Sequence, residues 1–73
     1  MATSDINAGA IKIVELVGIS KKSFEDAVAQ AVKKASVSIK GINGVEIISQ
    51  SAKVSNGKIT SYRANVKLAF AVK

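Results

Sequence analysis

The chain contains no cysteine, histidine, proline or tryptophan, and these absences exclude several kinds of site. Without cysteine there are no disulfides and no thiolate metal sites, and without histidine the other common transition-metal ligand is missing. The serines have no imidazole to act as their base, and no convergent set of acid, base and oxyanion groups can be named. We therefore predict that the protein is not an enzyme.

With 73 residues, the chain has room for one domain with one small core. A fold of this size is marginal as a monomer, because the apolar area it buries barely offsets the entropy of ordering the chain. Disulfides and structural transition metals are excluded above. Oligomerisation is the stabilising mechanism that we expect.

Charge of one sign is also scarce: five Asp and Glu stand against eleven Lys and Arg, which gives a net charge of +6. The acids are dispersed, so we predict no metal site within one chain, although symmetry could gather copies of Glu15 or Glu46. A basic nucleic-acid-binding module is an alternative function. The basic residues are scattered, however, and three aromatic residues are a poor supply for base stacking, so we expect no nucleic-acid partner.

The start of the chain, MATSDINAGA, has neither a basic region nor an apolar run, and no apolar run of about 18 residues occurs later. We expect a cytoplasmic protein with no membrane partner. Residues 1–10 are predicted to form a flexible tail, and residues 11–73 a single domain.

Two periodicities predict the secondary structure. Residues 10–18 are rich in β-branched residues and predict a mostly buried strand. From Ser23 onwards apolar residues recur every three or four positions as far as Ile39, which predicts an amphipathic helix. Ser23 is the expected N-cap, and Gly41 is the expected residue after the C-cap.

The second half of the chain predicts a long hairpin. Asn56-Gly57 suits a two-residue turn with two positive φ angles, and residues 59–73 alternate between apolar and polar side chains. Counting back from this turn without a bulge predicts the following pairs: Val45 with Leu68, Ile47 with Val66, Glu46 with Lys67, Ile48 with Asn65, and Gln50 with Arg63. The last strand is too long for one short helix to cover, so we expect a neighbouring subunit over the remainder.

Four segments, KIVELVG, SFEDAVAQAVKKA, GVEI and GKITSYRANVKLAF, resemble the dodecin family in their order and spacing. The resemblance implies an α+β fold, a β-α-β-β unit whose three-stranded antiparallel sheet wraps around one helix. It also implies a non-catalytic homododecamer, a hollow sphere of twelve copies that stores, buffers or sequesters a small ligand. In the family that ligand is a flavin, riboflavin or FMN.

The resemblance places the family's flavin-binding positions on Gly44, Ser49 and Arg63. A family tryptophan falls on Gly44, a glutamine falls on Arg63, and an often acidic position falls on Ser49, which an unbulged register would direct into the core. Without the aromatic ring we predict weak or undetectable flavin binding. Arg63 is either a solvated strand residue or a contact for another, anionic ligand, because guanidinium binds phosphate and carboxylate in bidentate fashion. Ions bound by the shell are a further alternative.

Overall fold

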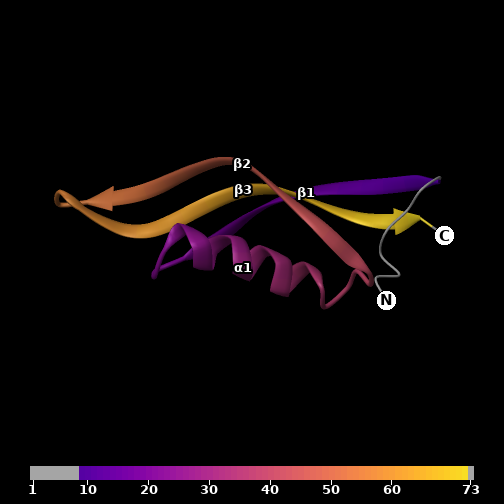
Figure 1. Ribbon diagram of the computed structural model, residues 1–73. Helices are drawn as coiled ribbons and strands as arrows, with labels where there is room; N and C mark the ends of the chain where they lie inside the picture. Colours follow the sequence, from indigo (N-terminus) through magenta and orange to yellow (C-terminus); the bar gives the residue numbers. More distant parts are fainter. Residues whose placement is uncertain (1–8, 73) are drawn as a thin grey trace.

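A computed structural model describes residues 9–72, which form one helix and one three-stranded sheet (Figure 1). The elements are β1 (Ala10–Ser20), α1 (Phe24–Ala35), β2 (Ile42–Ser55) and β3 (Lys58–Val72). The strand order is β1-β3-β2, and both pairings are antiparallel. The predicted β-α-β-β fold is confirmed. The predicted tail, residues 1–10, lies outside the described residues as far as Ala8, and Ala10 begins β1.

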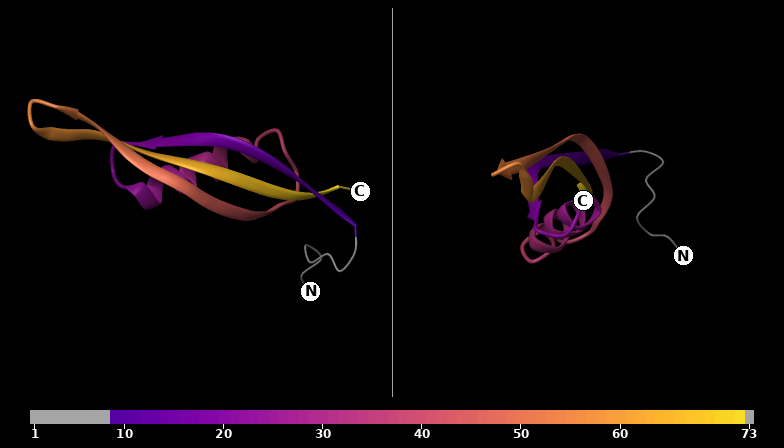
Figure 2. Two further views of the ribbon diagram at one scale, coloured as in Figure 1. Left: turned by 90° about the horizontal axis from the view of Figure 1, so that it is seen from above. Right: turned by 90° about the vertical axis from the view of Figure 1, so that its left-hand side faces the viewer.

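The sheet curls around α1, which packs mainly on β1 and β3 and only slightly on β2 (Figure 2). The side of the sheet that faces α1 is called the helix side below, and the opposite, convex side is called the outer side. The core is small and consists of five buried apolar residues: Ala27, Ala31, Ala64, Val66 and Leu68. Three of the five are alanines, so the helix and sheet approach each other closely but bury little apolar volume.

Gly18 makes this close approach between β1 and α1 possible. A Cβ atom at this position would lie 1.9 Å from the carbonyl oxygen of Ala27 and 3.0 Å from the Cβ of Ala31. Any other residue would therefore force the helix away from the strand.

Side-chain hydrogen bonds determine where α1 begins. Ser23 Oγ accepts a hydrogen bond of 2.9 Å from the backbone N–H of Asp26, which confirms the predicted N-cap. Ser20 Oγ, at the end of β1, donates to Asp26 Oδ2 at 2.6 Å and accepts from the backbone N–H of Lys22 at 2.8 Å. These bonds join the end of β1 to the first turn of the helix.

The helix ends earlier than predicted. It stops at Ala35 with Ser36 as the C-cap, so the expectations that the helix reaches Ile39 and that Gly41 follows its C-cap are wrong. The residues Ser36-Val37-Ser38 have lower helix propensity than the alanines and lysines before them, which explains the earlier end. Gly41 does have a positive φ of 75°, but it lies immediately before β2.

The hairpin turn is as predicted, and the register is partly so. Asn56 and Gly57 have φ angles of 53° and 75°, as a type I′ turn requires. The pairs Val45–Leu68, Glu46–Lys67 and Ile47–Val66 are confirmed. The pairs predicted for Ile48 and Gln50 are wrong: Asn65 lies opposite Ser49, and Arg63 lies opposite Ser51.

Two compensating irregularities cause this shift of one residue. Ile48 is an extra residue in β2, and Thr60 is an extra residue in β3 close to the turn. Thr60 Oγ1 donates a hydrogen bond of 3.2 Å to the carbonyl oxygen of Lys53, which lies across the hairpin from the irregularity. Between the two irregularities every residue of β2 is displaced by one position relative to β3, so each side chain changes face.

Candidate functional site

Polar side chains gather on the outer side of the sheet, in the middle of β2 and β3. The strand registers place three rows of residues side by side across β1, β3 and β2: Ile19, Arg63 and Ser51; Val17, Asn65 and Ser49; Glu15, Lys67 and Glu46. The five residues Ser49, Ser51, Arg63, Asn65 and Lys67 are called the polar strip below. On β1 the strip is bordered by the apolar residues Val17 and Ile19.

All three predicted site residues lie on this outer side. Ser49 and Arg63 belong to the polar strip and are close neighbours, because their partners Asn65 and Ser51 are two residues away along the same strands. The irregularity at Ile48 therefore directs Ser49 outward, in contrast to the unbulged register, which directed it into the core. The resemblance assigns Ser49 to the ligand-binding positions, and the backbone geometry directs its side chain outward, so the two agree for this residue.

Gly44 lies far from the other two residues within one chain. It pairs with Ala69, which is six residues from Arg63 along β3, a separation of about 20 Å at roughly 3.3 Å per residue. A ligand that contacts both Gly44 and Arg63 would need them from different subunits. A flavin site as the resemblance implies is thus not formed within one chain.

The backbone of this chain does not require glycine at position 44. Its φ angle is ordinary, and an added Cβ would meet only the Cβ of Ala69, at a normal contact distance of 3.5 Å. A hollow of about 330 Å³ adjoins it, lined by Val32, Ile42, Asn43, Gly44 and Val45. The position can therefore accept a larger side chain, but it presents no ring face for stacking.

Asn65 belongs to the polar strip, although its importance was not recognised in the sequence. Its Oδ1 atom is buried and has no hydrogen-bond partner among the described residues. Leaving a buried acceptor unpaired costs about 1–3 kcal/mol, so native proteins rarely do so. The atom needs a donor that the described residues of one chain do not supply. The only signal in the sequence is that Asn65 stands between Arg63 and Lys67 on the polar face of an alternating strand.

The described residues bring too few carboxylates together for a metal site within one chain. Glu15 and Glu46 flank Lys67 in one row, so an ammonium group already lies between them. Across residues 9–72 there is no cluster of three or more His, Cys, Asp or Glu residues. Ca²⁺ takes six to eight oxygen ligands, so the described residues of a single chain do not fit such an ion.

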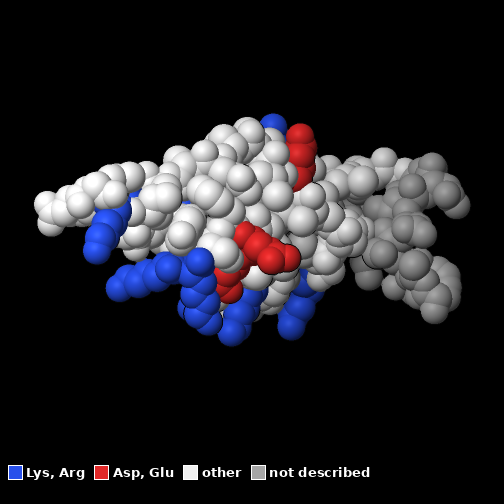
Figure 3. All heavy atoms as spheres, turned by 60° about the vertical axis from the view of Figure 1, so that its left-hand side comes forward, with Lys and Arg blue, Asp and Glu red and all other residues white. Residues whose placement is uncertain are grey.

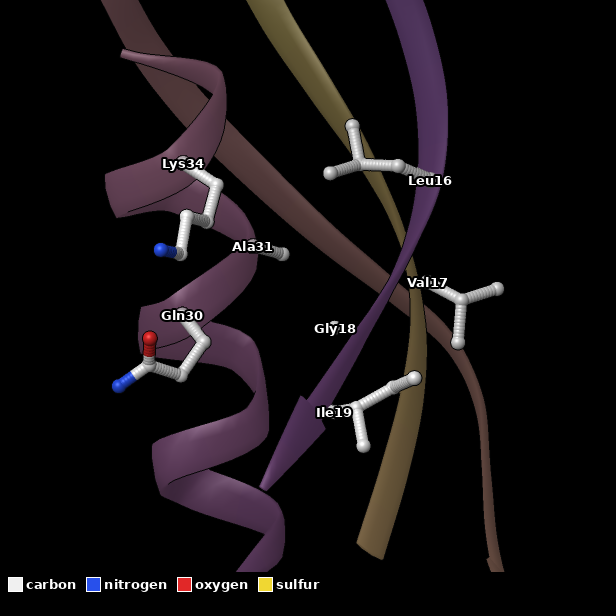
Figure 4. A pocket seen from close by; sticks show the side chains of 7 residues that line it. All are labelled: Leu16, Val17, Gly18, Ile19, Gln30, Ala31 and Lys34. Atoms are coloured by element: carbon white, nitrogen blue, oxygen red, sulfur yellow. The ribbon is translucent and has the colours of Figure 1, made fainter. Parts of the chain in front are cut away.

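A second hollow, of about 230 Å³, lies between β1 and α1 (Figure 4). Leu16 points toward the helix, whereas Val17 and Ile19 point away from it. The polar ends of Gln30 and Lys34 are directed away from β1, and the floor is formed by Gly18 and Ala31. Since no polar groups converge in this hollow, it is a gap in helix packing and a poor ligand site.

The charged side chains leave much of the surface uncharged. On the face shown in Figure 3, most Lys and Arg side chains gather along the lower margin, Asp and Glu lie near the middle and at the upper edge, and a broad area between them is uncharged. No described helix is long and apolar enough to cross a membrane. Large apolar side chains contribute to this uncharged surface, as the exposed residues of β1, β2 and the hairpin show.

These features define a class: a small helix-and-sheet unit with a polar strip on its outer side, broad exposed apolar surfaces and, within residues 9–72, no catalytic constellation. The family comparison is consistent with this description. The model of the Dodecin family matches residues 10–73, and the chain belongs to the dodecin family. This is a family of non-catalytic binding proteins.

Individual relatives support the assignment. The chain is 38% identical over 60 residues to the calcium dodecin of Mycobacterium tuberculosis, covering 81% of this chain and 83% of that protein. A crystal structure of calcium dodecin from the same organism, described as having a novel calcium-binding site, matches with a TM-score of 0.77 at 32% identity, covering 89% and 93% of the two chains. The dodecin of Streptomyces coelicolor matches with a TM-score of 0.88 at 22% identity, covering 93% and 97%, which shows a shared fold.

Proposed function

We propose that twelve copies of this chain form a hollow dodecin-type shell that stores or sequesters a small ligand. The main support for this assembly is that few apolar side chains are buried in the core, whereas many are exposed on the surface. Only five apolar residues are buried, whereas eleven large apolar side chains among the described residues are exposed. Monomeric proteins rarely expose apolar patches of this extent.

The exposed residues are sufficient to stabilise an assembly. Full burial of a Val or Ile side chain contributes about 1.5–3 kcal/mol, so a half-exposed side chain retains roughly half of this for an interface. Eleven such side chains would contribute on the order of 8–16 kcal/mol per chain before the cost of association. Sedimentation velocity tests the assembly, with an expected particle of about 91 kDa from twelve chains of 7.6 kDa.

The polar strip supports an anionic ligand for this shell. Arg63 supplies a fork of N–H donors, and Ser49 and Ser51 supply hydroxyl donors on the neighbouring strand. The apolar side chains of Val17 and Ile19 border these donors on β1. A ligand with a phosphate or carboxylate group and an apolar part matches this arrangement.

Flavin itself fits less well, because Gly44 provides no aromatic ring to stack against the isoalloxazine. A titration that compares riboflavin with FMN separates the two contributions, since the two molecules differ by the phosphate group. We expect weak or undetectable riboflavin binding and tighter FMN binding, and the difference should disappear in Arg63→Gln. Lys40→Gln is the matched control, because it removes one positive charge away from the strip.

Two outcomes would contradict this reading. Sub-micromolar quenching of riboflavin fluorescence by the unmodified protein would show that the missing ring is not needed. Equal affinities for riboflavin and FMN would show that the polar strip does not recognise phosphate.

Calcium is a second candidate ligand, because the calcium dodecin of Mycobacterium tuberculosis matches this chain both in sequence and in its crystal structure. The described residues of one chain do not fit the ion, so this function would need copies of Glu15 or Glu46 brought together by symmetry. Isothermal titration with CaCl₂ tests it, with Glu46→Gln and Glu15→Gln as the informative variants. If neither variant changes the binding of Ca²⁺, these carboxylates are not its ligands.

A further inference from the structure

Two serines closely follow a pair of lysines, and they lie at opposite ends of α1. The two stretches are KKSF, residues 21–24, and KKASV, residues 33–37. In both, cationic side chains precede a hydroxyl group, and a large apolar side chain follows it. Serine kinases with an acidic substrate cleft select this order of charge, hydroxyl and apolar group. The sequence does not distinguish the two serines, but their surroundings in the structure do.

Ser23, in the first stretch, is engaged as the N-cap of α1. Its Oγ atom accepts a hydrogen bond of 2.9 Å from the backbone N–H of Asp26, and the residue is half-buried. The next residue, Phe24, packs edge-on against Tyr62 with ring centroids 5.0 Å apart. A kinase would have to unfold the first turn of the helix to reach this hydroxyl group.

Ser36, in the second stretch, is exposed together with the groups around it. Lys33 and Lys34 are exposed in the last turn of α1. Val37 is 78% exposed, the largest fraction among the exposed large apolar residues of the described chain. The cations, the hydroxyl group and the apolar side chain are therefore all accessible to a partner.

The backbone that follows α1 is suited to local opening. Residues 36–41 link α1 to β2 and belong to neither element (Figure 1). Short turns hold them, with hydrogen bonds from the N–H of Val37 to the carbonyl of Lys34 at 3.3 Å and from the N–H of Ser38 to the carbonyl of Ala35 at 3.1 Å. Segments with exposed backbone hydrogen bonds and few buried apolar contacts open at a low free-energy cost. Such a segment can straighten in a kinase cleft while the sheet and helix stay folded.

The charge around Ser36 is of one sign. No acidic residue occurs between Asp26 and Glu46, whereas this part of the chain contains Lys33, Lys34 and Lys40. A cleft lined by carboxylates attracts such a surface and raises the rate of encounter. The local charge thus favours the same partner as the order of side chains.

We propose that Ser36 is a phosphorylation site for a serine kinase that selects basic substrates. Carboxylates of the kinase bind Lys33 and Lys34, and an apolar pocket binds Val37. Ser36 Oγ attacks the γ-phosphorus of ATP, the bond from that phosphorus to the bridging oxygen breaks, and ADP leaves. The hydroxyl proton passes to the catalytic aspartate of the kinase. The proposal is independent of the assembly and of the ligand proposed above.

The phosphate lowers the positive charge at the end of α1. It adds a charge of about −1.5 to −2 at pH 7, against a net charge of +6 for the chain. The negative end of the helix dipole opposes the phosphate. Lys33 stands three residues before Ser36, on the same side of the helix, and is placed to pair with it.

Treatment of the native protein with a kinase tests the site. The probe is the catalytic subunit of cyclic-AMP-dependent protein kinase with Mg²⁺ and ATP, and a standard peptide substrate confirms its activity. We expect the intact mass to increase by one phosphoryl group per chain. Trypsin cleaves after Lys34 and Lys40, so fragmentation of the peptide 35–40 distinguishes Ser36 from Ser38. Ser36→Ala should abolish the incorporation, and Ser38→Ala should leave it unchanged.

The two lysine pairs provide a matched comparison. Replacing Lys33 and Lys34 by Gln should lower the initial rate by up to about fivefold for each lysine, the equivalent of about 1 kcal/mol for an exposed charge pair. Replacing Lys21 and Lys22 by Gln removes the same charge from the other end of α1 and should retain the rate.

Three outcomes would overturn the assignment. The first is a phosphate on Ser23 or Ser38 in place of Ser36. The second is no incorporation under conditions that fully phosphorylate the peptide substrate. The third is an equal change in rate from the two pairs of lysine substitutions, because the cations before Ser36 would then have no particular role.

Discussion

Replacing Gly18 with alanine should disrupt the packing of α1 against β1. The added Cβ would lie 1.9 Å from the carbonyl oxygen of Ala27, and an ordinary contact requires at least 3.4 Å, so the helix would have to move by about 1.5 Å. The obstacle is helix backbone, which cannot rotate away as a side chain can. Overpacking typically costs 1–3 kcal/mol, and we take about 3 kcal/mol for this contact.

Urea unfolding followed by circular dichroism measures the effect. With an m-value of about 1–3 kcal/mol/M, a loss of about 3 kcal/mol lowers the midpoint by roughly 1–3 M. Gly44→Ala is the matched control, since its Cβ would make only a normal contact of 3.5 Å with Ala69. All samples need equal chain concentration, because assembly contributes to stability. Midpoints of the two variants within 0.5 M of each other, an interval of roughly 1 kcal/mol, would refute the reasoning.

Three further predictions concern riboflavin binding, the hydrogen bonds of Ser20 at the start of α1, and nucleic-acid partners. Gly44→Trp should raise riboflavin affinity about five- to 150-fold, as 1–3 kcal/mol of stacking implies, and adding Arg63→Gln should raise it further; fluorescence quenching measures both. Ser20→Ala removes hydrogen bonds of a side chain that is 6% exposed, and should lower the free energy of unfolding by about 1–3 kcal/mol in denaturant titrations. Oligonucleotides, single- or double-stranded, should not bind at 150 mM salt by fluorescence anisotropy, because the basic residues are dispersed; submicromolar binding would contradict this.

The sequence was most informative where one local rule decides the structure. Asn56-Gly57 defines the turn, and the alternation through Val66 and Leu68 defines the face that packs on the helix. Ser23 is recognisable as the N-cap because its hydroxyl has a backbone N–H to accept from three residues later. Such features depend on neighbours in the chain, so they can be predicted without tertiary contacts.

The sequence was least informative about features that depend on contacts between residues far apart in the chain. Ile48 and Thr60 are unremarkable in sequence, yet together they shift the middle of the hairpin by one residue and direct Ser49 outward. Gly18 and Gly44 both stand within strand patterns, but only Gly18 has a helix carbonyl against it. The unpaired Oδ1 of Asn65 likewise becomes evident only after folding, because the burial of an atom is not a property of the sequence.

Native mass spectrometry of the purified, unmodified assembly tests the central claim most directly, because it reports copy number and bound ligand together. The account predicts one particle of about 91 kDa, twelve chains of 7.6 kDa, carrying additional mass from an anionic small molecule and no stoichiometric flavin. A monomer or dimer at micromolar concentration would contradict the shell, and a twelve-chain particle loaded with riboflavin would contradict the interpretation of Gly44 and Arg63.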